Sequence, residues 1–134
     1  MLECLIIGDS IAFGVSMVRP ECTAIVRSGI NSANWNRNFL PAVQPAKTVI
    51  ISLGTNDSHI DTESNLRKLR AAVKAPRVFW LLPSHKLRPE QFRIVNYVAR
   101  MNGDIVIPRP EKDISPDGIH PTNKGYKTLG YLTK

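Results

Sequence analysis

The stretch LECLIIGDS, residues 2–10, joins a continuous apolar run to a glycine, an acid and a serine. An uninterrupted run of this kind is typical of a parallel strand that is buried on both faces. A strand with one solvent-exposed face instead alternates apolar and polar residues. Further short apolar runs lie at residues 23–26, 48–53, 78–82 and 104–107. The chain therefore contains five candidate strands.

Segments with helical spacing separate these runs. The clearest is residues 62–73, where Leu66, Leu69 and Val73 recur on one helical face. The others are residues 11–18, 31–40, 89–103 and 123–132. Alternating strands and helices predict an α/β protein, a three-layer α/β/α domain whose five-stranded parallel sheet is covered by helices on both faces. With 134 residues, no repeat and no linker, the chain is expected to form one domain, residues 1–134.

The chain is basic, with a formal net charge of +7. Between residues 64 and 100 nine basic residues face a single acid, Glu90: Arg67, Lys68, Arg70, Lys74, Arg77, Lys86, Arg88, Arg93 and Arg100. Their scattered spacing is typical of solvated helix faces, and a surface for a polyanion is the alternative. No aromatic residues interleave them in a stacking pattern, so a nucleic-acid partner is not expected.

The two cysteines, Cys4 and Cys22, are too few for a disulfide framework and are expected to be buried thiols. The chain shows no secretory signal and no apolar stretch long enough to span a membrane, which favours the cytoplasm; a virion protein or an excised domain would look the same. Histidines and cysteines with metal-ligand spacing are lacking, as are glycine-rich phosphate loops, so neither a metal nor a cofactor is expected.

Polar residues follow the carboxyl ends of four predicted strands, at residues 8–10, 28–29, 54–57 and 117–120. In a parallel sheet these groups meet at one edge, where ligands bind. Ser10 is a candidate nucleophile, His120 the base that activates it, and Asp117 the carboxylate that orients the imidazole. The backbone N–H groups of Ser10 and Gly29 and the amide of Asn56 are candidate donors to an oxyanion.

These motifs resemble, in order and spacing, the four sequence blocks of the SGNH (GDSL-type) hydrolase family: Gly8-Asp9-Ser10, Gly29, Gly54-Thr55-Asn56-Asp57 and Asp117-Gly118-Ile119-His120-Pro121. The resemblance covers nearly the whole chain. It implies a flavodoxin-like fold, a Ser10-His120-Asp117 triad and an oxyanion hole made by Ser10, Gly29 and Asn56. The chain departs from the family where Ser28 precedes the second-block glycine, since many members have asparagine there. It also has no room for a lid domain.

Three further residues are candidates for substrate contact. His59 and His85 each follow a predicted strand, and Trp35 follows Gly29 closely. A surface position is favoured for both histidines and a core position for the tryptophan, and substrate contact is the alternative.

Together these features predict a cofactor-independent serine esterase that hydrolyses short-acyl esters, with acetyl groups on carbohydrate as one example. The small size of the chain favours a small acyl group. A thioesterase, a lysophospholipase or an acyltransferase would use the same triad, and a non-catalytic module that binds polyanions is an alternative from another class.

Overall fold

The computed structural model describes all 134 residues and has a single five-stranded sheet. All strand pairs are parallel, in the order β2-β1-β3-β4-β5. The strands are β1 (Leu2–Gly8), β2 (Thr23–Val26), β3 (Ala46–Ser52), β4 (Arg77–Leu81) and β5 (Ile105–Ile107). The helices are α1 (Ser10–Val18), α2 (Ser32–Phe39), α3 (Thr62–Ala72), α4 (Pro89–Met101) and α5 (Asn123–Leu132), with a 3-10 turn η1 (Leu40–Ala42).

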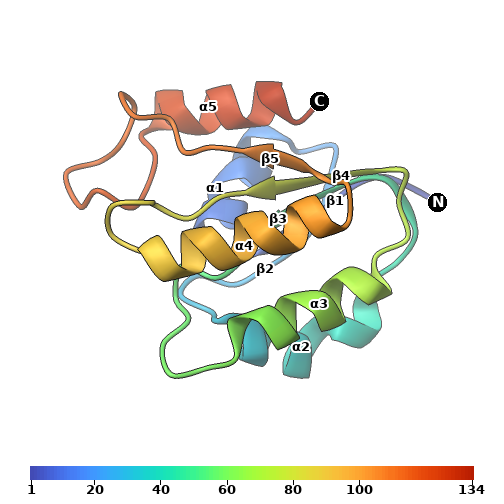
Figure 1. Cartoon of the computed structure of the whole chain (residues 1–134). Helices are drawn as coiled ribbons and strands as arrows, with labels where there is room; N and C mark the ends of the chain where they lie inside the picture. Colours follow the sequence, from blue (N-terminus) through green and yellow to red (C-terminus); the bar gives the residue numbers. More distant parts are fainter.

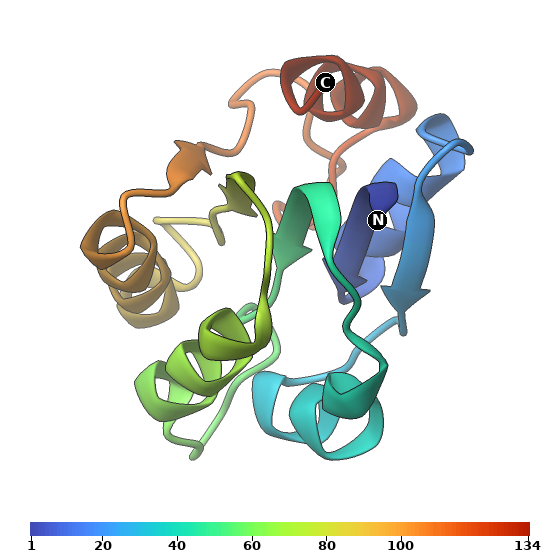
Figure 2. The same ribbon diagram turned by 90° about the vertical axis from the view of Figure 1, so that its right-hand side faces the viewer.

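Helices cover both faces of the sheet. Helices α1 and α5 lie on one face, and α2, α3 and α4 lie on the other (Figures 1 and 2). This arrangement confirms the predicted three-layer α/β/α fold.

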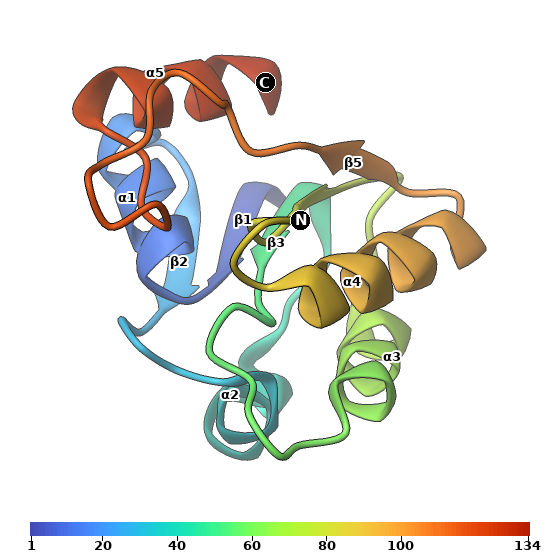
Figure 3. The ribbon, with the colours of Figure 1, turned by 60° about the vertical axis from the view of Figure 1, so that its left-hand side comes forward.

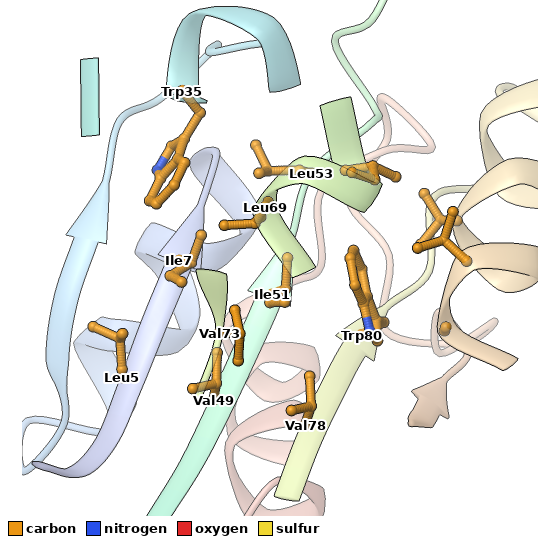
Figure 4. Packing of buried hydrophobic residues seen from close by; sticks show 14 of the residues in the cluster. Leu5, Ile7, Trp35, Val49, Ile51, Leu53, Leu69, Val73, Val78 and Trp80 are labelled. Atoms are coloured by element: carbon orange, nitrogen blue, oxygen red, sulfur yellow. The ribbon is translucent and has the colours of Figure 1, made fainter. Parts of the chain in front are cut away.

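Two hydrophobic clusters, one on each face, explain the continuous apolar run in β1. Leu5 and Ile7 belong to the larger cluster, beneath α2, α3 and α4, with Trp35 and Trp80 (Figure 4). Ile6 belongs to the smaller cluster, against α1 and α5. Because successive strand residues point to opposite faces and both faces are covered, β1 gains stability from apolar residues at each position from Cys4 to Ile7.

The cysteines form a disulfide, so the prediction of two buried thiols is wrong. Cys4 lies within β1, and Cys22 immediately precedes β2. The parallel register pairs Leu5 with Thr23, which places the two cysteines side by side with Cα atoms 4.8 Å apart. The bond fastens the edge strand β2 to its neighbour β1.

The strand order defines where a ligand can bind. After β1 the chain places β2 on one side, and then returns to place β3 on the other. The connections that leave β1 and β3 therefore diverge at their carboxyl ends, and such a switch point opens a crevice in parallel α/β sheets. The turn from β1 into α1 and the loop from β3 towards α3 border this crevice.

None of the helices α1 to α5 combines the length and apolar character required to cross a membrane.

Candidate active site

The turn from β1 into α1 presents Ser10 at the crevice. Gly8 has φ of +142°, and a side chain there would clash with the carbonyl oxygen of Ser52, so the turn requires glycine. Asp9 caps α1: its Oδ1 accepts the N–H groups of Ile11 (3.0 Å) and Ala12 (3.4 Å). The cap fixes the start of the helix, and with it the position of the Ser10 hydroxyl.

Ser10, His120 and Asp117 form a hydrogen-bonded chain. The Oγ atom of Ser10 lies 2.8 Å from Nε2 of His120, and Nδ1 of the same ring lies 2.6 Å from Oδ2 of Asp117. An ionised carboxylate only accepts hydrogen bonds, so Nδ1 carries the proton of the neutral ring. Nε2 is then free to accept the proton of Ser10, as a general base must.

Asp117 is held as a carboxylate. The hydrogen bond from the His120 ring is the largest cause that lowers the pKa of Asp117 well below its usual range. The backbone N–H groups of His120 (2.9 Å) and Ile119 (2.8 Å), both donated to Oδ1, lower it further. The same contacts fix the carboxylate on a tight turn, so that it orients the imidazole.

The loop between β5 and α5 carries this turn back to the start of α1 (Figure 3). Its two arms are joined by a bridge between Ile114 and Pro121, and the N–H of Ser115 donates to the carbonyl oxygen of His120 at 2.8 Å. Thr122 then caps α5 by accepting the N–H of Gly125. These bonds hold the loop at the triad turn, which explains how a segment without regular structure positions His120.

The candidate oxyanion donors lie on the loops after β1, β2 and β3. Ser10 is the first residue of α1, and the first N–H groups of a helix have no partner within it. Gly29 is exposed, has φ of +77°, and its N–H makes no hydrogen bond within the chain. The amide of Asn56 donates one hydrogen to the carbonyl oxygen of Ile30 (3.2 Å), which ties it to the segment that carries Gly29. Its second hydrogen has no protein partner.

Asp57 fixes the loop that carries Asn56. This buried carboxylate accepts hydrogen bonds from the N–H and hydroxyl of Ser32 at 2.8 and 2.6 Å, and from the hydroxyl of Thr62 at 2.8 Å. On the other side, Arg88 donates to the carbonyl oxygen of Thr55 at 2.9 Å. The loop is therefore attached to α2, α3 and the start of α4.

Ser10 and His120 open into a groove of about 510 Å³ between α1 and α5. Apolar side chains of α1 form one wall, and Phe13 and Met17 are 47% and 68% exposed there. The groove is lined by Ser10, Phe13, Gly14, Met17, Val18, Ser28, His120, Pro121, Asn123, Tyr126 and Lys127.

The structure places the three candidate substrate contacts differently. Trp35 is fully buried, and its indole N–H donates to the carbonyl oxygen of Ile25 at 3.0 Å, so it cannot contact substrate. His59 is exposed beside a separate hollow that contains neither Ser10 nor His120. His85 is exposed, packs edge-on against Phe92, and lines a cavity next to the triad loop.

A cluster of ionisable side chains next to the triad was not predicted from the sequence: Asp9, Arg109 and Tyr126. Burial raises the pKa of Asp9 to about 6, despite its hydrogen bonds from Ser52 and the two N–H groups, and its Oδ2 has no partner. Arg109 supplies a nearby positive charge. Burial and the charge of Asp9 also raise the pKa of Tyr126. The only signal for Arg109 in the sequence is its position between two prolines in a long loop after the last strand.

Comparison with known proteins identifies the fold. No protein-family model matches the chain, and no curated protein matches it. Solved structures match over almost its whole length. A GDSL-like lipase from Bacteroides thetaiotaomicron is 16% identical, with a TM-score of 0.66 over 98% of this chain and 85% of that one. The carbohydrate acetylesterase Est24 from Sinorhizobium meliloti is also 16% identical, with a TM-score of 0.66 over 98% of this chain and 96% of that one.

A third match is the catalytic domain of peptidoglycan O-acetyltransferase A from Streptococcus pneumoniae, which is 16% identical with a TM-score of 0.67 over 96% of this chain and 88% of that one. At such identities the likeness establishes the fold. The chain has the three-layer fold of the GDSL-type hydrolases, which confirms the fold that the sequence motifs implied.

Proposed function

We propose that the chain is an SGNH-type serine esterase in which Ser10 is the nucleophile. The observation that carries the proposal is the continuous contact from Ser10 through His120 to the ionised Asp117, at 2.8 and 2.6 Å. It lies at the switch point of a sheet whose fold is shared with esterases. A nucleophile, a base and a group that orients the base are the parts required for acyl transfer.

The reaction follows from this arrangement. His120 takes the proton of Ser10 as the hydroxyl attacks the ester carbonyl, and Asp117 stabilises the imidazolium that forms. The N–H groups of Ser10 and Gly29, with the free amide hydrogen of Asn56, bind the developing oxyanion. His120 then gives its proton to the leaving alcohol, and an acyl-enzyme remains. Water activated by His120 releases the acid and restores Ser10, so the cycle needs no cofactor.

The acyl group is proposed to be short, with acetyl on a carbohydrate as the favoured case. Two of the matched structures are a carbohydrate acetylesterase and a peptidoglycan O-acetyltransferase. The groove beside Ser10 also favours a small acyl group, because Phe13 and Met17 in its wall are 47% and 68% exposed and no closed tunnel surrounds the nucleophile. A long acyl chain would gain little burial there.

The test compares 4-nitrophenyl acetate with 4-nitrophenyl octanoate. We expect kcat/KM to be at least tenfold higher for the acetate, and to be lost for both esters in Ser10→Ala. Ser16→Ala is the matched control, because Ser16 lies on the same helix but hydrogen bonds to the carbonyl oxygen of Phe13. A strong preference for octanoate would contradict the short acyl group, and full activity in Ser10→Ala would contradict the nucleophile.

Acyl transfer to a sugar acceptor is a second candidate, favoured by the matched O-acetyltransferase domain. Both reactions share the acyl-enzyme and differ only in whether water or a sugar hydroxyl attacks it. Adding chitooligosaccharide or cellooligosaccharide to the acetate assay separates them: an esterase releases acetate in proportion to nitrophenol, whereas a transferase forms acetylated sugar in its place.

A further inference from the structure

A second cavity, of about 380 Å³, lies beside the loop that carries Asp117 and His120. It shares no lining residue with the groove, but it reaches Gly118, the residue next to Asp117. Its wall comes from the segment after β4 and the loop after β5. The lining residues are Ser84, His85, Lys86, Arg109, Pro110, Glu111, Ile114 and Gly118.

The cavity is predominantly basic. Arg109 and Lys86 carry positive charge, and Glu111 is the only acid in the lining. Burial is the largest cause that lowers the pKa of Arg109, and the positive charge of nearby Arg88 also lowers it. A concave site with this balance attracts anions.

The guanidinium of Arg109 has unused donors. The Arg109 side chain makes no hydrogen bond and no ion pair: Nη1 is fully buried without a partner, whereas Nε and Nη2 also have no partner but are not fully buried. The other arginines that are buried or half-buried have partners: Arg19 pairs with Glu21, Arg70 pairs with Asp104, and Arg88 donates to the carbonyl oxygens of Thr55 and Leu87. Burial lowers the pKa of Arg109, while the charges of Asp9 and Asp117 oppose that effect from a distance. An arginine held this way binds a planar or tetrahedral anion through two parallel hydrogen bonds.

The position of the cavity relative to the triad determines which part of a substrate can reach the cavity. His120 returns its proton to the leaving oxygen, so the alcohol portion of the ester must lie towards the triad loop. The oxyanion donors Gly29 and Asn56 lie on the loops after β2 and β3 instead. A group attached to the alcohol is therefore the part that can extend past Gly118.

We propose that the cavity lined by Arg109 and Lys86 is a subsite for an anionic group, a carboxylate or a phosphate, on the alcohol portion of the substrate. This inference rests on the proposed esterase function and specifies its substrate as an acetylated acidic alcohol, such as a sugar acid or a phosphorylated sugar. It gives Arg109 a role in substrate specificity, a role that the triad residues do not have.

The first experiment uses three acetate esters of similar size: 3-acetoxybenzoate, 3-acetoxyphenyl phosphate and the neutral 3-acetoxybenzamide. We expect kcat/KM to favour an anionic ester at least tenfold, since hydrogen bonds to charged groups contribute about 1.5 to 3 kcal/mol and about 1.4 kcal/mol is a factor of ten. The benzoate and phosphate arms show which anion is preferred. Equal kcat/KM values for all three esters would overturn the proposal.

Two variants locate the preference. Arg109→Gln should reduce the ratio of anionic to neutral kcat/KM at least tenfold, and Lys86→Gln should reduce it less. Arg109 also influences Asp9, which caps the helix that carries Ser10. Any resulting change in the rate of the chemical step applies equally to all three esters, so it cancels in the ratio. Lys86→Gln keeps the test valid if Arg109→Gln fails to fold. Lys68→Gln, the same charge change on the exposed face of α3, should leave the ratio unchanged. An unchanged ratio in both cavity variants would overturn the proposal.

A binding measurement separates this subsite from the esterase activity. In Ser10→Ala, calorimetry should show tighter binding of 3-hydroxybenzoate than of 3-hydroxybenzamide, and the difference should disappear in Ser10→Ala/Arg109→Gln. Selective binding without esterase activity in the wild type would support the subsite and contradict the proposed function. Esterase activity with equal binding of the two alcohols would support the function and contradict the subsite.

Discussion

Replacing Asp9 with asparagine should change how the stability of the protein depends on pH. The folded protein holds the pKa of Asp9 at about 6 by burial, against an ordinary value of 3.8. Between these two values the folded state binds a proton that the unfolded state has lost, so the free energy of unfolding falls as the pH rises. At about 1.36 kcal/mol for each pH unit, the total loss is about 3 kcal/mol, complete above pH 7. Asparagine keeps an oxygen acceptor for Ile11, Ala12 and Ser52 but has no proton to lose.

The assay is urea unfolding between pH 3.5 and 7.5, followed by the fluorescence of the buried Trp35 and Trp80. The stability of Asp9→Asn relative to the wild type should increase by about 3 kcal/mol across this range, with most of the change between pH 4 and 6. Taking the difference cancels groups common to both proteins, including Asp117, whose lowered pKa places its effect at lower pH. Glu3→Gln, an exposed carboxylate, controls for loss of a charge. Parallel curves for Asp9→Asn and the wild type would refute the reasoning.

Three further outcomes are expected. Replacing Cys4 and Cys22 together with alanine should lower the free energy of unfolding by roughly 3 kcal/mol, because the disulfide closes a loop of 18 residues in sequence; equal urea midpoints with and without the bond would contradict this. Asn56→Ala should lower kcat for 4-nitrophenyl acetate roughly 10² to 10³-fold if the amide binds the oxyanion, whereas an unchanged rate would remove it from the site. Asp117→Asn should lower kcat by a factor on the order of 10³ to 10⁴, since the His120 tautomer is then no longer fixed, and a loss under tenfold would argue against that role.

The sequence predicted the fold because the inner strands β1, β3 and β4 are buried on both faces over most of their length and therefore carry continuous apolar runs. The predicted strand boundaries differ from the observed ones by one or two residues, because strand pairing rather than polarity determines where a strand begins and ends. The third strand begins at Ala46, ahead of the apolar run, because Ala46 pairs with Leu2. The fifth begins at Ile105, which pairs with Phe79, because the backbone N–H of Asp104 instead donates to the carbonyl oxygen of Ala99 in α4.

The candidate triad was predictable because its residues follow strand ends, which a parallel sheet brings to one edge. Features that depend on register or side-chain direction were not. The disulfide requires Cys4 and Cys22 to be neighbours across β1 and β2, and the register that makes them so is invisible in either run alone. Trp35 is close to Gly29 in sequence, yet it points into the core from α2. Arg109 lies in a long loop without periodicity, where nothing local indicates its burial.

The most direct test of the account is intact-mass labelling with a fluorophosphonate, which forms a covalent adduct with activated serines. The wild type should gain one adduct, mapped to Ser10, and Ser10→Ala should gain none. His120→Ala should label far more slowly, because no base removes the serine proton, while Ser16→Ala should label like the wild type. Absence of an adduct on folded wild-type protein, or an adduct that persists in Ser10→Ala, would contradict the claim that Ser10 is an activated nucleophile.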